Sequence, residues 1–145
     1  MGVASSMETN KRLIAIYQRW FHHGDEHTSA INHLNAWIGF YEKVLRKLIK
    51  PEMTVLDLGS GPGFFINQVL AQKCIAVDAD ATNVKYIRKD IEFLNLEAQN
   101  LEFIPDNSVD LIFSSDLFEH LSSSDDLFEV LQSAHRVMKK EILKW

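Results

Sequence analysis

Residues 53–63, MTVLDLGSGPG, constrain the fold of this chain more than any other stretch. Strand-forming residues end at Asp57, and Gly59, Gly61 and Gly63 then occupy alternate positions. Glycine permits backbone dihedrals that other residues avoid, and it lets a ligand approach the backbone closely. In parallel α/β sheets, ligands bind outside the carboxyl ends of the strands. The stretch therefore predicts a buried strand that leads into a ligand-binding turn.

The rest of the chain alternates between strand and helix patterns. Short, β-rich apolar runs predict strands at residues 54–58, 74–78, 91–96 and 109–115. Apolar residues at helical spacing predict helices at about 10–21, 29–50, 62–71, 82–90 and 124–140. This alternation is typical of a parallel α/β sheet. We expect one structural domain, with residues 1–50 as an N-terminal helical cap and residues 51–145 as its core.

Length, charge and cysteine content exclude several classes of protein. The 145 residues suffice for one domain with its own core. A net charge of −5 argues against binding to nucleic acid. The single cysteine, Cys74, cannot form an internal disulfide and indicates a reducing compartment. No apolar run approaches the roughly 20 residues that a membrane span needs, so we expect a cytoplasmic protein with no membrane partner.

Two kinds of cofactor compete for the glycine turn. A dinucleotide site prefers the pattern G-x-G-x-x-G, with free amides at a helix start to hold the pyrophosphate. Here Phe64 occupies the place of the last glycine, and Pro62 removes one amide. S-adenosylmethionine (SAM) carries no phosphate, so the same departures do not weaken a SAM site. The turn favours SAM over a nicotinamide cofactor.

Three motifs together carry a resemblance to a known family. VLDLGSGPG resembles motif I of the class I SAM-dependent methyltransferases, and IAVDAD resembles the acidic motif that follows their second strand. PDNSVDLIFSSDLFEHL is similar to the fourth-strand segment of that family. The resemblance spans about residues 53–140. It implies a Rossmann-like three-layer sandwich with a mostly parallel sheet, preceded here by two helices, and SAM as the cofactor.

The resemblance also implies a set of cofactor contacts. Asp78, at a strand end, would accept hydrogen bonds from the two ribose hydroxyls, with a helix N-cap as its alternative role. Glu97 would lie beside the adenine amino group, but the loop that follows is one residue longer than usual, so a solvated loop acid stays open. The implied cofactor-binding residues are Asp57, Gly59, Ser60, Gly61, Asp78, Ala79, Glu97, Ala98 and Ser114.

Candidates for the chemistry and for the acceptor pocket come from two other stretches. His120, in FEHL just past the fourth strand, is the best-placed proton acceptor, with capping or packing of the next helix as its alternative. Tyr17, Trp20 and His22 precede motif I and would wall the substrate pocket, although core packing explains the aromatic residues equally well. The stretch HHGDEH (22–27) has histidines four apart, but Gly24 interrupts the helix that would align them. We expect no metal site.

The predicted function is transfer of a methyl group from SAM to a small-molecule acceptor. The alternative is a catalytically inactive, methyltransferase-like subunit with a role in assembly or regulation. The family's sheet has seven strands in the order 3-2-1-4-5-7-6, and this sequence supplies patterns for the first four. We therefore expect the fourth strand to be an edge. The chain would then pair through residues 109–115, with itself or a partner chain, or be a fragment of a longer enzyme.

Overall fold

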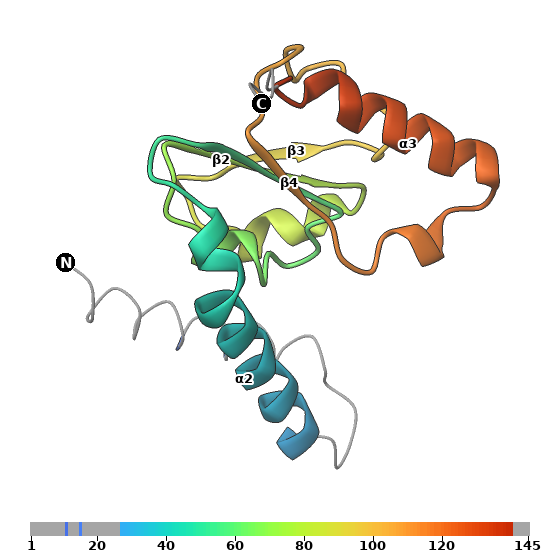
Figure 1. Cartoon of the computed structure of the whole chain (residues 1–145). Coiled ribbons are helices and arrows are strands. Elements are labelled where there is room, and N and C mark those ends of the chain that lie inside the picture. Colours follow the sequence, from blue (N-terminus) through green and yellow to red (C-terminus); the bar gives the residue numbers. More distant parts are fainter. Residues whose placement is uncertain (1–10, 12–14, 16–26, 141–145) are drawn as a thin grey trace.

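The computed structural model describes residues 11, 15 and 27–140. Its elements are α2 (His27–Lys43), η1 (Leu45–Leu48), β1 (Thr54–Leu58), η2 (Ile66–Gln68), β2 (Lys73–Asp78), η3 (Ala81–Tyr86), β3 (Glu92–Asn95), β4 (Leu111–Phe113), η4 (Phe118–His120) and α3 (Ser124–Val137). The four strands are parallel and lie in the order β3-β2-β1-β4 (Figure 1). The predicted α/β fold and the expected strand order are confirmed.

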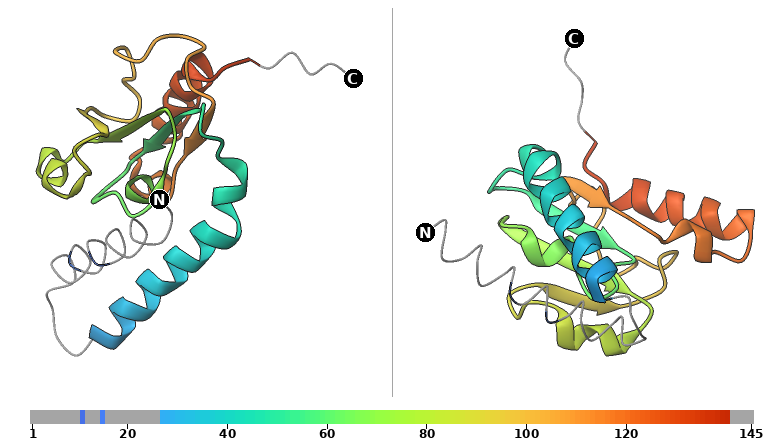
Figure 2. Two further views of the ribbon diagram at one scale, coloured as in Figure 1. Left: turned by 90° about the vertical axis from the view of Figure 1, so that its left-hand side faces the viewer. Right: turned by 90° about the horizontal axis from the view of Figure 1, so that it is seen from below.

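Alternate residues of the strands point to opposite faces of the sheet, and each face has its own apolar cluster. One cluster includes α3 and the loop before β4; its buried members are Leu56, Leu58, Ile75, Val77, Ala98, Leu101, Ile104, Val109, Val130 and Val137. The other cluster includes α2 and η2; its buried members are Tyr41, Val55, Phe65, Ile66, Val69, Cys74, Ala76, Ile87 and Ile91. Helices on both faces make the three layers that Figures 1 and 2 show.

The segment between β1 and β2 is not the α-helix that its apolar spacing predicts. Residues 62–71 form turns and the short 3₁₀ helix η2 instead. Gly63 has a φ of 80°, which lies outside the right-handed helical region. The buried Asn67 side chain donates to the Tyr86 carbonyl (3.1 Å) and accepts from the Arg88 amide (2.7 Å). Side-chain hydrogen bonds of this kind compete with a regular helix.

Polar side chains cap the helices that follow β2 and η4. Residues 82–90, expected as a helix, contain only the 3₁₀ helix η3, and Asp80 caps it by accepting from the Thr82 amide at 2.9 Å. The helix α3 begins as predicted, because Ser123 accepts from the Asp126 amide at 3.1 Å. It ends three residues earlier than the expected Lys140.

One acidic residue before β4 holds that strand beside β1. Asp110 accepts hydrogen bonds from the Thr54 amide (2.8 Å) and from the Lys139 ammonium group (2.8 Å). The hydrogen bond with Lys139, followed by the one with Thr54, lowers the pKa of Asp110. These contacts hold the start of β4 beside the start of β1, and the parallel register then places Phe113, at the carboxyl end of β4, beside Asp57.

The predicted pairing of β4, the boundary at residue 50 and the predicted substrate-pocket residues are not tested by the structure. Within the described residues β4 is the edge of the sheet, as expected, and its pairing with another chain stays a prediction. The division into a cap and a core at residue 50 also stays a prediction. Tyr17, Trp20, His22 and most of HHGDEH lie outside the described residues. Among the helices described, none combines the length and the apolar character needed to cross a membrane.

Candidate cofactor site

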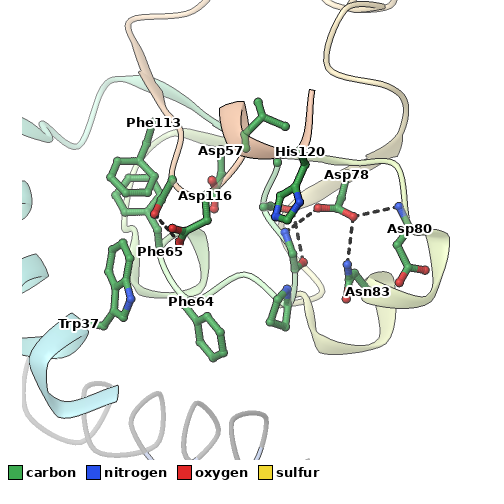
Figure 3. A pocket seen from close by; sticks show the side chains of 16 residues that line it. Trp37, Asp57, Phe64, Phe65, Asp78, Asp80, Asn83, Phe113, Asp116 and His120 are labelled. Atoms are coloured by element: carbon green, nitrogen blue, oxygen red, sulfur yellow. Dashed lines mark hydrogen bonds between the residues drawn. The ribbon is translucent and has the colours of Figure 1, made fainter. Parts of the chain in front are cut away.

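A cavity of about 420 Å³ opens at the carboxyl ends of β1, β2 and β4 (Figure 3). Its lining residues are Trp37, Asp57, Gly59, Ser60, Gly61, Pro62, Phe64, Phe65, Asp78, Asp80, Asn83, Phe113, Ser115, Asp116, Leu117 and His120. A second cavity of about 290 Å³ lies on the β3 side and shares Gly59, Asp78, Asp80, Leu117 and His120 with the first. The shared residues place the two cavities next to each other. Sites at this edge of a parallel sheet are where ligands bind.

The glycine turn after β1 depends on backbone conformations that favour glycine. Gly59, Gly61 and Gly63 have φ values of 76°, 49° and 80°. The Gly59 amide donates to the carbonyl of Val77 in β2 at 2.9 Å, and the Gly61 amide donates to the Asp78 carboxylate at 2.7 Å. The turn is therefore fastened to the end of β2 and faces the cavity.

Asp78 ends β2 and holds three N–H groups of the protein. One carboxylate oxygen accepts from the Gly61 amide, and the other accepts from the Asp80 amide (2.9 Å) and the Asn83 side chain (3.0 Å). A carboxylate offers about four acceptor positions, so about one remains free. Two ribose hydroxyls would need two, so a ligand held in that way must displace one of the three N–H groups.

Asp57 is the buried acid of the site, with 3% of its surface exposed. The pKa of Asp57 is raised to about 8, mainly by burial; a hydrogen bond from the Ile66 amide opposes this rise, and the negative charge of Asp78 contributes to it. A neutral carboxyl inside a cavity becomes charged readily when a cation binds beside it. The position of Asp57 therefore suits a ligand with a positively charged group.

The structure brings most of the predicted cofactor-binding residues to these two cavities. The larger one contains Asp57, Gly59, Ser60, Gly61 and Asp78, and the second contains Ala79, Glu97 and Ala98. Ser114 lines neither cavity; its hydroxyl donates to the Leu58 carbonyl at 2.8 Å, and Ser115 lines the larger cavity beside it.

His120 lies in η4, is exposed to solvent and lines both cavities. The N-cap of α3 is Ser123, so His120 does not cap the helix that follows it. Its imidazole is free of that structural role, and its predicted role as proton acceptor stays a prediction. Among the described residues, no cluster of His, Cys, Asp and Glu could hold a metal ion.

Sequence patterns did not identify the aromatic residues Trp37, Phe65 and Phe113 or the acid Asp116 as parts of the site. Phe113 at the end of β4 stacks on Phe65 at 4.0 Å, and Trp37 of α2 meets the edge of Phe113 at 6.0 Å between ring centroids. Asp116 and Asn83 also line the cavity. Asp116 lies inside the fourth-strand motif, in SSDLFEH. Its position directly after that strand was the feature of the sequence that could have indicated a place in the site.

Comparisons with known proteins agree with this geometry. Residues 56–141 match the family model of the methyltransferase domain. No curated protein matches the chain. Among solved structures, the YcgJ protein of Bacillus subtilis is 27% identical, with 74% of this chain and 46% of that chain covered and a TM-score of 0.55. The PH0226 protein of Pyrococcus horikoshii is 26% identical, with 85% and 60% covered and a TM-score of 0.59.

A third solved structure shares the fold. It is a SAM-dependent methyltransferase of Thermotoga maritima, described as a possible histamine N-methyltransferase. It is 23% identical, with 92% of this chain and 56% of that chain covered and a TM-score of 0.61. The chain thus spans about half the length of these similar proteins. The matched family, the three motifs and the four-stranded sheet together show that the chain belongs to the methyltransferase domain family.

Proposed function

We propose that this chain binds SAM at the carboxyl ends of β1, β2 and β4 and transfers its methyl group to a small-molecule acceptor. The observation that carries the proposal is the convergence of Asp57, Gly61 and Asp78 on one cavity that opens between these strand ends. The three residues come from the two motifs that resemble the family's cofactor-binding motifs.

The groups that line the two cavities fit the chemistry of SAM. Asp78 supplies hydrogen-bond acceptors for hydroxyls, and Asp57 supplies a buried carboxyl for an ammonium group. The second cavity has apolar walls at Leu96 and Ala98 for a planar base, with Glu97 between them.

The same lining argues against a dinucleotide. No Lys or Arg of the described residues lines either cavity, whereas Asp57, Asp78 and Asp80 line the larger one. A pyrophosphate would face the carboxylates of Asp78 and Asp80 without a compensating cation. This supports SAM over the nicotinamide alternative.

Bound SAM supplies a methyl group that its sulfonium already activates. The chain has to orient the acceptor in line with that methyl and to exclude water, which is worth roughly 7–11 kcal/mol in favourable cases. We assign orientation to the walls of the larger cavity. His120 would take a proton from an acceptor that must lose one, because it lines the cavity from η4 and is exposed to solvent.

We expect Asp78→Ala to weaken SAM binding by about 1.5–3 kcal/mol, the range for hydrogen bonds to a charged group, which is about 10- to 150-fold in the dissociation constant. The substitution removes the ribose acceptor and also releases the Gly61 amide. Isothermal titration measures the constant, and the circular dichroism spectrum verifies the fold.

Asp125→Asn is the matched control, because Asp125 is exposed in the first turn of α3 and lines neither cavity. It should bind SAM as the unchanged chain does. An unaltered dissociation constant in folded Asp78→Ala would contradict the ribose assignment. A SAM-binding chain that transfers no methyl to any acceptor would favour the inactive subunit instead.

A further inference from the structure

The larger cavity has two chemically different ends. In Figure 3, Asp78 and Asn83 lie on one side, and Trp37, Phe113 and Asp116 lie on the other. The Asp78 side adjoins the second cavity, because Asp78 lines both. The proposed SAM site runs from that side to Asp57, so the end beyond Asp57, with Trp37, is the space left for the methyl acceptor.

The acceptor end has an aromatic wall built from three parts of the chain. Trp37 of α2 meets Phe113 of β4 edge to face, with ring centroids 6.0 Å apart and planes at 80°. Phe113 stacks in turn on Phe65, which directly precedes η2, at 4.0 Å. Phe65 covers one face of Phe113, and all three rings line the cavity. The face of an aromatic ring attracts a cation that lies within about 6 Å of its centroid.

Asp116 places a carboxylate at the same end. It follows β4 and has a φ of 57°, a conformation that Asp and Asn adopt more readily than most residues. The Ser115 hydroxyl donates to its carboxylate at 2.8 Å. That partner is neutral, so the negative charge of Asp116 is not balanced by it.

The other carboxylates of the cavity have partners within the protein. Asp78 holds the glycine turn, and Asp80 caps η3 through Thr82. Asp57 is buried and has its pKa raised to about 8, so it carries little charge at neutral pH without a ligand. No Lys or Arg of the described residues lines the cavity. An anionic acceptor would therefore find no Lys or Arg among the described residues to offset its repulsion by Asp116.

We propose that the methyl acceptor is a small organic amine, bound in its ammonium form between Asp116 and the rings of Trp37 and Phe113. This inference rests on the proposed function and names the acceptor class for the same cavity. A neutral alcohol could donate one hydrogen bond to the Asp116 carboxylate, whereas an ammonium group donates one and also gains the attraction between opposite charges and a cation–π contact.

In methyl transfer to such an amine, His120 can accept the proton that leaves and Asp116 can stabilise the charge that forms. The ammonium gives a proton to the imidazole of His120, which passes it to solvent. The nitrogen lone pair then forms the new N–C bond while the methyl C–S bond breaks, and the electron pair of that bond stays on sulfur. The positive charge moves from sulfur to nitrogen, and Asp116 stabilises it there.

The test is isothermal titration of the full 145-residue chain, saturated with S-adenosylhomocysteine, with three compounds of matched shape. They are 2-phenylethylamine, 2-phenylethanol and phenylacetate. We expect the amine to bind at least tenfold more tightly than the other two. In Asp116→Asn, which keeps the shape and tolerates the same φ, this preference should fall at least tenfold while S-adenosylhomocysteine affinity stays within twofold.

Two further variants separate a charge effect from a general loss of structure. Trp37→Leu removes a ring but keeps the carboxylate, so it should weaken amine binding and leave the amine as the preferred compound. Asp125→Asn, outside both cavities, should behave as the unchanged chain does.

The outcomes distinguish this inference from the proposed function. A chain that binds S-adenosylhomocysteine but binds the amine no more tightly than the alcohol, or not at all, overturns the amine assignment. An amine preference that survives in Asp116→Asn overturns it as well. Failure to bind S-adenosylhomocysteine overturns the proposed function, and titration of the unloaded chain with the amine still tests the charge preference of the cavity.

Discussion

Replacing Gly61 with valine should abolish SAM binding, with the dissociation constant rising more than 100-fold. Gly61 has a φ of 49°, and its amide donates to Asp78 at 2.7 Å. A β-branched residue is strained in this conformation, so the turn would move away from the end of β2. The added side chain would also fill space in the cavity that Gly61 lines. Isothermal titration with SAM measures the loss, and thermal unfolding reports on the fold.

Gly39→Ala provides the matched control for that substitution. Gly39 lies in α2, and a Cβ placed there meets no atom within 4 Å. Alanine at that helical position should leave SAM binding unchanged and slightly raise the melting temperature. A folded Gly61→Val chain that binds SAM with an affinity within threefold of the original would mean that the ligand does not approach this turn.

The second large effect is on stability, and it depends on pH. Burial raises the pKa of Asp57 to about 8 from its ordinary 3.8. The folded state therefore holds a proton that the unfolded chain loses at lower pH. This contribution to stability is complete below about pH 4 and is lost as pH rises towards 8, at about 1.4 kcal/mol for each pH unit. We expect the melting temperature of the unliganded chain to fall through this window, after the contributions of other groups are subtracted.

Asp57→Asn keeps the size of the side chain and its acceptor for the Ile66 amide but cannot ionise. Its melting temperature should exceed that of the unchanged chain at pH 8, and the difference should close towards pH 4. Asp125→Asn, exposed on α3, should follow the unchanged chain at both pH values. Equal pH dependence in the Asp57→Asn and unchanged chains would show that Asp57 is ionised in the folded protein.

Binding of SAM should offset the loss of stability that Asp57 causes as pH rises. An ammonium group beside Asp57 stabilises the charged carboxylate, so SAM binding below pH 8 should release a proton. Titrations in buffers that differ in ionisation enthalpy count the protons released. Asp57→Asn should bind SAM more weakly and release fewer protons. The residue would then illustrate how a binding site lowers the stability of the unliganded protein.

The sheet and its glycine turn could be predicted because their signals are local. The runs at residues 54–58 and 74–78 are short, β-rich and followed by a turn, and β1 and β2 lie there. The prediction of a helix at residues 62–71 was wrong, and the spacing of apolar residues could not have shown why. Its apolar residues are spaced for a helix, but Gly63 takes a positive φ, and Asn67 bonds to backbone groups of Tyr86 and Arg88, about 20 residues away.

The acceptor end of the cavity was predictable only in part, because its walls come from distant parts of the chain. Trp37 and Phe113 are 76 residues apart and meet only when α2 packs across the end of β4. Periodicity predicts which face of an element is buried, not which rings meet across elements. Asp116 lay within a recognised motif, but its role depends on its unusual φ and on the absence of basic residues among those described around the cavity.

The most direct measurement is isothermal titration of the 145-residue chain with SAM, S-adenosylhomocysteine and NAD under the same conditions. We expect saturable binding of SAM and of S-adenosylhomocysteine, each with one molecule per chain, and no heat of binding for NAD. Binding of NAD in preference to SAM, or no binding of SAM by a folded chain, would contradict it.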